Sequence, residues 1–209
     1  GAGSDTSGVG VSALVLSGSA AIGEAIVNAP VFIKCGGGYT ASGATSDLGA
    51  YSIAMPAGAN LPCIVRVTGS GITLHAATDA ISLPRETNVT PLTDLVLTVS
   101  ANQNAVSAFN GFGSSVPVFL TPIQLAASHK EVVDVFHGLL NISGIRSFVS
   151  EPLVPAVSSK GQKGNYYDQI LDDLKTKIAS KNASYTQIAA ALLLHKKGST
   201  AAISLWGDA

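Results

Sequence analysis

Six short apolar runs follow one another over residues 11–78, separated by segments that contain glycine, proline, asparagine or aspartate. The stretch GATSDLGAYSIAMPAG, residues 43–58, shows this pattern in most detail. Asp47 and Gly49 are typical of a tight turn, and Tyr51, Ile53 and Met55 then alternate with small residues, as in a half-buried strand. The stretch therefore predicts a strand, a tight turn and a second strand that form a hairpin.

The other runs predict strands in the same way. They are residues 11–18, 29–35, 38–45, 50–55, 61–69 and 72–78, and three glycines at 36–38 suit a hairpin turn between two of them. No long amphipathic helix separates the runs, so the pattern favours a β-sandwich over βαβ units.

The pattern changes after residue 90. In residues 90–109 the apolar side chains share a helical face, and Thr90 or Thr93 is the expected N-cap, although the many β-branched residues leave a strand as the alternative. That face consists of Leu92, Leu95, Val96 and Val99. A Gly/Pro/Ser-rich link, residues 111–122, follows.

Three further helices are expected, at 128–144, 165–180 and 185–198, and residues 199–206 read as a last extended segment. Ser128 and Glu131 form a capping box for the first, and Asn165 caps the second. The predicted fold is mixed α+β. It has an N-terminal tail (1–8), a β-sandwich (9–90) and a mainly helical C-terminal module (91–209).

The first part of the chain resembles a known family. APVFIKC, ATSDLGAYSIAMPAG and CIVRVTG together resemble the carboxypeptidase regulatory-like domain, also called transthyretin-like, over about residues 15–75. The hairpin motif here is Thr45, Asp47, Gly49, Tyr51 and Ile53, with one residue between Thr45 and Asp47 where the family often has none. The usual Gly-Ala before the first strand is Asn28–Ala29–Pro30. The resemblance implies an all-β scaffold that lacks catalytic groups of its own.

Cys35 and Cys63 are the only cysteines, and they lie 28 positions apart. In a secreted chain they should form a disulfide, which stabilises a loop of this size by about 3.5 kcal/mol. The alternative is a pair of buried free thiols. A metal site is disfavoured because each cysteine stands alone, without a second ligand at metal-binding spacing.

Charged residues are scarce. They make up 12% of the 209 residues, against roughly 25% in ordinary soluble domains, and the formal net charge is −1. This balance argues against nucleic acid as a partner, and no apolar run is long enough for a transmembrane segment. The start, GAGSDTSG, resembles the stretch after a secretory cleavage site. We expect a secreted, extracellular protein. NVTPLTDL, residues 88–95, is similar, together with the two cysteines, to bacterial surface proteins and lipoproteins.

Motifs for catalysis and metal binding are missing from the sequence, including GxSxG, GxGxxG, the P-loop and HExxH. The four histidines are His75, His129, His137 and His195. His129 and His137 do not share an edge of their expected helix, and His129 should face solvent near its start. Asp172 and Asp173 should be solvated. We therefore predict a protein that is not an enzyme and has no cofactor or metal.

Lys34 is a candidate for an isopeptide cross-link, since some relatives of this sandwich class join lysine to asparagine beside a buried acid. Glu24 and Asn88 are the conceivable partners. Strand alternation places Lys34 on the face opposite Cys35, so we expect it to point outward and the cross-link not to form.

The leading hypothesis is a structural, self-assembling surface protein, a pilus-like filament subunit. One end of the chain would add a strand to the next copy, which would hide an exposed sheet edge. The first candidate strand consists of Val9, Val11, Ala13, Leu14, Val15 and Leu16, and the second of Ala201, Ile203, Leu205 and Trp206.

The alternative hypothesis is a secreted or lipoprotein-derived adhesion module for a glycan or a partner protein. It needs an aromatic cluster, for which the candidates are Tyr39, Tyr51, Tyr166, Tyr167 and Trp206. Tyr166 and Tyr167 are adjacent, so Tyr167 should join the buried helix face and Tyr166 should be exposed.

Overall fold

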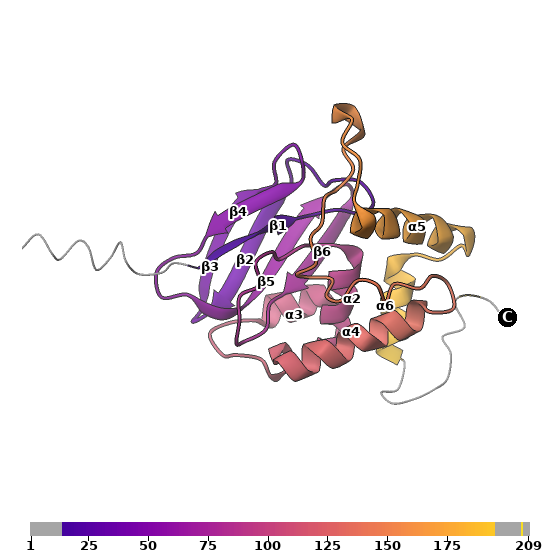
Figure 1. The fold of residues 1–209 in the computed structure, drawn as a ribbon. Coiled ribbons are helices and arrows are strands. Elements are labelled where there is room, and N and C mark those ends of the chain that lie inside the picture. The colour runs from indigo at the N-terminus through magenta and orange to yellow at the C-terminus, as the bar shows by residue number, and fades with distance from the viewer. Residues whose placement is uncertain (1–13, 195–205, 207–209) are drawn as a thin grey trace, which may run out of the picture.

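The structure, a computed structural model, describes residues 14–194 and residue 206. These residues form a mixed α+β fold with six strands in two antiparallel sheets and five helices (Figure 1). The strands lie at one end of the molecule and α5 and α6 at the other, with α2 and α4 between them.

All six apolar runs contain a strand, as the sequence predicts. One sheet pairs β1 with β4, and the other has the order β3-β2-β5-β6. The strands are β1 (Val15–Ser19), β2 (Pro30–Gly36), β3 (Tyr39–Ala44), β4 (Ala50–Ala54), β5 (Asn60–Gly69) and β6 (Ile72–Ala77). Gly37 and Gly38 turn β2 into β3 with φ angles of 88° and 80°, which only glycine adopts readily.

The expected hairpin of residues 43–58 is correct as a turn but wrong as a strand pair. Ser46 N–H donates to the Ala50 carbonyl, and Gly49 has a φ of 78°. However, β3 and β4 belong to different sheets. The buried Thr45 explains the crossing, because its hydroxyl donates to Ile26 O and accepts from Ala29 N–H. These two bonds hold the chain beside the loop before β2, where it passes from one sheet to the other.

The two sheets share one apolar core. Leu16 of β1 and Ile53 of β4 belong to the same buried cluster as Val31 and Ile33 of β2 and Val65 of β5. Gly43 of β3 lies so close to Ile53 that a Cβ there would sit 2.8 Å from the Ile53 side chain. The inner face of β3 therefore packs against the Ile53 side chain of β4.

Helix α2 (Pro91–Ala101) is the central element of the fold, and the strand alternative for these residues is wrong. The Thr90 side chain caps it by accepting from Leu92 N–H and Thr93 N–H. Nine of its 11 residues are buried, so the helix is covered on every side. Leu97 packs with Ile64 and Ala77 of the sheet, whereas the predicted face of Leu92, Leu95, Val96 and Val99 packs into the helical core.

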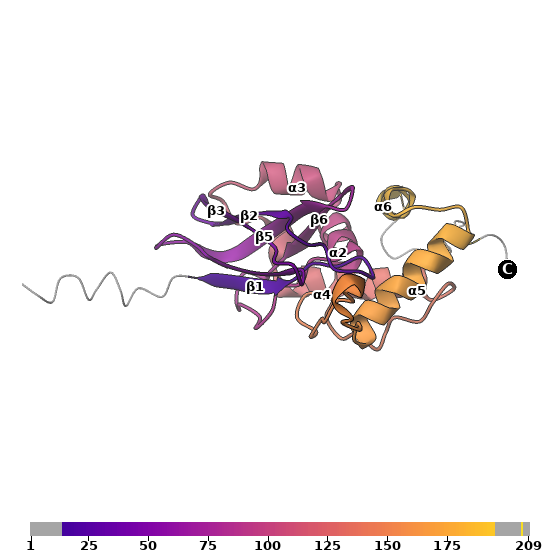
Figure 2. The same ribbon diagram turned by 90° about the horizontal axis from the view of Figure 1, so that it is seen from above.

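Helix α3 (Ala105–Gly111) covers the outer face of the four-stranded sheet, opposite β1 (Figure 2). Phe109 is its anchor. Its ring contacts Phe32 edge-on at 6.1 Å between centroids, and the cationic groups of Lys34 and Arg66 lie 4.6 and 4.7 Å from its centroid. The ring thus joins the helix to the sheet through both apolar and cation–π contacts.

Helix α4 corrects the expected capping box. It spans Pro122–Phe136, with Thr121 as N-cap, so Ser128 and Glu131 lie in its interior. Thr121 followed by Pro122 supplies both a capping hydroxyl and a residue whose fixed φ suits the first turn. The Ser128 hydroxyl donates to Gln124 O within the helix. The helix also ends before the expected residue 144, and Ile142 and Ile145 return to the core as parts of turns.

The last described helices are α5 (Tyr166–Ser180) and α6 (Tyr185–Leu194), close to the expected positions. Asn165 caps α5, as predicted, by accepting from Asp168 N–H. The short 3-10 turns η1 (Val118–Leu120) and η2 (Ser158–Lys160) complete the described elements. The tail at 1–8 lies outside the described residues. The boundary at 90/91 stays a prediction, because α2 packs on both β6 and the helical core.

We predict that Phe109→Ala lowers the free energy of unfolding by about 3–5 kcal/mol, since it removes a fully buried ring. Urea unfolding followed by circular dichroism measures the effect. Val106→Ala, on the exposed side of the same helix, should change stability by less than about 0.5 kcal/mol. Equal losses in the two variants would show that Phe109 is not the anchor of α3.

Candidate functional site

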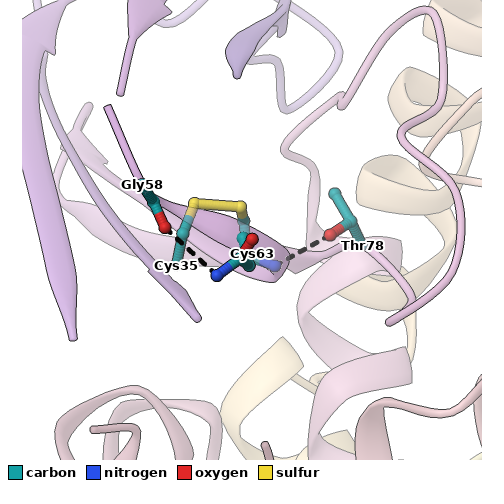
Figure 3. The surroundings of a disulfide bond; sticks show 5 residues. Cys35, Gly58, Cys63 and Thr78 are labelled. Carbon is teal, nitrogen blue, oxygen red and sulfur yellow. Dashed lines mark hydrogen bonds between the residues drawn. A yellow bond between two sulfur atoms is a disulfide. The ribbon is translucent and has the colours of Figure 1, made fainter. Parts of the chain in front are cut away.

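The predicted disulfide is present. Cys35 of β2 and Cys63 of β5 are register partners on neighbouring strands, with 4.1 Å between their Cα atoms. Figure 3 shows the bond at one end of the strands, where Cys63 N–H also donates to the Thr78 hydroxyl at 2.8 Å. The disulfide joins the two central strands of the larger sheet directly. The hydrogen bond to Thr78 fixes the start of the loop that leaves β6.

The first candidate exchange strand is only partly within the described residues. Val9, Val11 and Ala13 lie outside them. Leu14 O accepts from Met55 N–H of the same chain, and Val15 and Leu16 pair with Ala54 and Ile53 in β1. The other edge of β1 is also occupied, because Thr87 N–H and Val89 N–H donate to carbonyls of Ser17 and Ser19. The expectation that Leu14, Val15 and Leu16 belong to a donated strand is therefore corrected, and a donated segment must end before Leu14.

The second candidate strand receives a similar correction. Ala201, Ile203 and Leu205 lie outside the described residues. Trp206 is described, and it packs on its own chain: its ring stacks on Phe136 at 5.8 Å, and its Nε1–H donates to Val135 O at 2.9 Å. The indole is therefore part of the helical core, which satisfies its polar atom. It is not an exposed end of an extended strand.

Strand β3 forms an unprotected sheet edge, which sequence reasoning did not identify. The one strand hydrogen-bonded to it among the described residues is β2, and five of its six residues are exposed. Natural edge strands usually carry charges, proline or a bulge that prevent pairing with another chain. β3, with the sequence YTASGA, has neither a charged residue nor proline. The sequence shows that residues 39–44 carry no charge, but only the sheet order shows that they form an edge strand.

The histidines do not converge. His75 is buried, with Nδ1 2.9 Å from Asp94 Oδ2, and this contact ties β6 to the first turn of α2. His129 was expected to face solvent, but it lies in the middle of α4, half-buried against Phe148. His137 is the exposed C-cap of α4, and His195 lies outside the described residues. Within 14–194, no three His, Cys, Asp or Glu side chains gather so that they could hold a metal ion.

Lys34 lies on the face opposite Cys35, as predicted, but α3 covers this face. Its Nζ donates to Phe109 O at 3.0 Å. The two conceivable cross-link partners have other contacts. Asn88 is buried and bridges Ser19 N–H and Glu151 O, and Glu24 accepts from Ser158. The expectation that Lys34 points outward into solvent is therefore wrong.

The aromatic candidates for a glycan surface are dispersed. Tyr51 and Tyr167 are buried, and their hydroxyls donate to the carbonyls of Thr87 and Phe148. Burial raises the pKa of both tyrosines. Tyr166 is exposed, as the helix face predicts, with 55% of its surface accessible. These positions do not supply a shared stacking platform, because Tyr51, Tyr167 and Trp206, three of the five rings, pack into the core.

Among the residues that the structure describes, Asp168 is the buried carboxyl, and its pKa is shifted. Its Oδ2 accepts from Ala156 N–H at 3.0 Å, whereas its buried Oδ1 has no hydrogen-bond partner among the described residues. Desolvation raises its pKa, and the nearby charges of Asp172 and Glu24 act in the same direction. Asp172 and Asp173 themselves are exposed, as predicted.

Comparisons with protein-family models, curated proteins and solved structures find no match to this chain. None of the helices that the structure describes has the length and apolarity that crossing a bilayer requires. The candidate site therefore rests on geometry alone. It is the charge-free edge of β3, beside the pair of β1 and β4.

We predict that the double variant Cys35→Ala/Cys63→Ala loses about 3 kcal/mol of unfolding free energy, because the unfolded chain is no longer constrained by a loop with a sequence separation of 28. Urea unfolding with and without dithiothreitol measures this. The reductant should destabilise the wild type by a similar amount and leave the variant unchanged. A wild type that is insensitive to complete reduction would contradict the prediction.

We predict that Asp168→Asn flattens the pH dependence of stability. A raised pKa in the folded state means that Asp168 contributes stability below the unfolded carboxyl pKa of about 3.9, and this contribution is lost as pH rises through the folded pKa. The asparagine keeps an acceptor for Ala156 N–H and cannot ionise. The free energy of unfolding of the variant should therefore increase relative to that of the wild type as the pH rises through the folded pKa of Asp168. Urea unfolding at a series of pH values measures it. Asp173→Asn is the exposed control, and parallel curves for Asp168→Asn and the wild type would contradict the prediction.

Proposed function

We propose that this protein is a non-enzymatic, extracellular structural protein that assembles with copies of itself into a surface filament, and that the edge of β3 is the acceptor for a strand from the next copy. The observation that carries the proposal is the free, charge-free and exposed edge of β3. An edge of this kind is a template for pairing with another chain.

The donor in this proposal is the segment of residues 9–13, which ends where the intrachain contacts of Leu14 begin. Val9, Val11 and Ala13 alternate with Gly10 and Ser12, the period of a strand with one apolar face. The acceptor backbone supplies main-chain hydrogen bonds, and the alternate side chains supply register. Donor and acceptor are different surfaces, so each copy carries one of each, and the contact propagates into a filament when the rotation between copies does not close into a ring.

Two further features support assembly outside the cell. The disulfide joins the strands next to the proposed acceptor, and such bonds persist in oxidising compartments. Charged residues make up only 12% of the chain, which leaves a surface with little charge repulsion between copies. In this proposal the two sheets are a transthyretin-like β-sandwich that serves as scaffold, and the location is a bacterial cell surface.

The test is sedimentation velocity and negative-stain microscopy of the full chain at increasing concentration. We predict concentration-dependent polymers for the wild type and monomers for Thr40→Lys/Ser42→Lys, because two positive charges along β3 oppose edge pairing. Thr68→Lys is the matched control, since it places one lysine at an exposed position of β5, an interior strand of the same sheet. Val11→Pro should also abolish assembly from the donor side.

Each outcome decides a separate point. A wild type that stays monomeric at high concentration contradicts assembly. Polymers that persist in the Thr40→Lys/Ser42→Lys variant contradict β3 as the acceptor. Loss of polymers in Thr68→Lys as well would mean that charge in general, and not the edge, opposes association. Circular dichroism and urea unfolding confirm that each variant is folded.

A further inference from the structure

A cavity of about 370 Å³ opens where three segments far apart in sequence meet. They are the loop that follows β6, helix α4 and the loop at residues 146–150. Val96 of α2, Leu125 of α4 and Phe148 give the cavity apolar walls. A volume of this order is within the range of pockets that bind small molecules. The cavity is separate from the β3 edge and does not depend on assembly.

Arg146 lines this cavity and is exposed. Among the residues that the structure describes, its guanidinium has no hydrogen bond or ion pair. The guanidinium has five N–H donors in a planar fork that suits a carboxylate. An unpaired guanidinium beside apolar walls is the arrangement that an apolar molecule with one anionic group requires.

The other titratable groups of the cavity are already engaged. The His129 ring packs against Phe148 with 4.2 Å between centroids and is hydrogen-bonded to the backbone of Ile145. Desolvation lowers the pKa of His129, which favours the uncharged ring. Asp79 Oδ1 accepts from Ile81 N–H and Ser82 N–H at 2.7 and 2.8 Å, which commits this carboxylate to its own turn. Arg146 is therefore the cation that is available to a ligand.

Two exposed isoleucines are adjacent in sequence to residues that line the cavity. Ile81 is next to the lining residue Ser82 and has 76% of its surface exposed, and Ile123 is next to Pro122 and has 83% exposed.

We propose that this cavity binds an amphipathic monocarboxylate, with the carboxylate on Arg146 and the alkyl or aryl body against Val96, Leu125 and Phe148. The guanidinium supplies charge-assisted hydrogen bonds to the head group, and the apolar walls bury the body. In this proposal a carboxylate binds more tightly than an alcohol of equal chain length, because only the carboxylate forms charge-assisted hydrogen bonds with Arg146.

Isothermal titration calorimetry of the full chain with octanoate and with 1-octanol tests this proposal. The wild type should bind octanoate saturably at one site and more tightly than 1-octanol. Arg146→Gln should weaken octanoate at least about 10-fold and leave 1-octanol unchanged, because a hydrogen bond to a charged group contributes this much. Arg146→Lys should restore part of the octanoate affinity.

Two controls keep the test specific. Arg85→Gln removes the same charge from the neighbouring loop without altering the cavity lining, so octanoate affinity should stay at the wild-type value. Ser150→Trp adds bulk at a lining position and should weaken both ligands. The absence of saturable octanoate binding, equal affinity of the wild type for the two ligands, or an equal loss in Arg85→Gln would each overturn the proposal.

Discussion

The structure depends on the burial of α2 between the sheets and the other helices. Leu97 packs onto β5 and β6, and Leu92 and Leu95 pack into the helical core. A helix that is apolar on all sides is stable only when other elements surround it. The polar atoms at its start are satisfied by the same arrangement, since Thr93 Oγ1 donates to His75 O and Asp94 accepts from His75. The sheets and the other helices are thus held together by α2, because both pack against it.

The two proposed functional surfaces differ in chemical character. The edge of β3 offers main-chain hydrogen-bonding groups with small, uncharged side chains, and such a surface recognises another backbone. The cavity offers apolar walls and an unpaired arginine, and such a site recognises a small amphipathic anion. The disulfide stabilises the strand next to β3, so the edge is presented by a rigid sheet. The two proposals can therefore be tested separately by substitution.

Much of the fold was predictable because its signals are local. Period-two alternation located the strands, and the Thr90 and Asn165 caps located the starts of α2 and α5. The errors came where a competing local signal was stronger. Thr121–Pro122 started α4 before the capping box at Ser128, and Thr45 carried the chain between sheets at a turn that looked like an ordinary hairpin. The transthyretin-like resemblance and the filament function stay predictions.

The sequence by itself determined the positions of the strands, the starts of α2 and α5, the one possible disulfide pair and the scarcity of charge, because each follows from residue type and spacing along the chain. Only the tertiary structure decided that β3 is an edge strand, that Lys34 and Trp206 are covered by their own chain, and that Arg146 stands beside a cavity. These properties depend on which segments lie next to one another in space. Strand order and burial arise from packing between residues distant in sequence, and no local pattern records them.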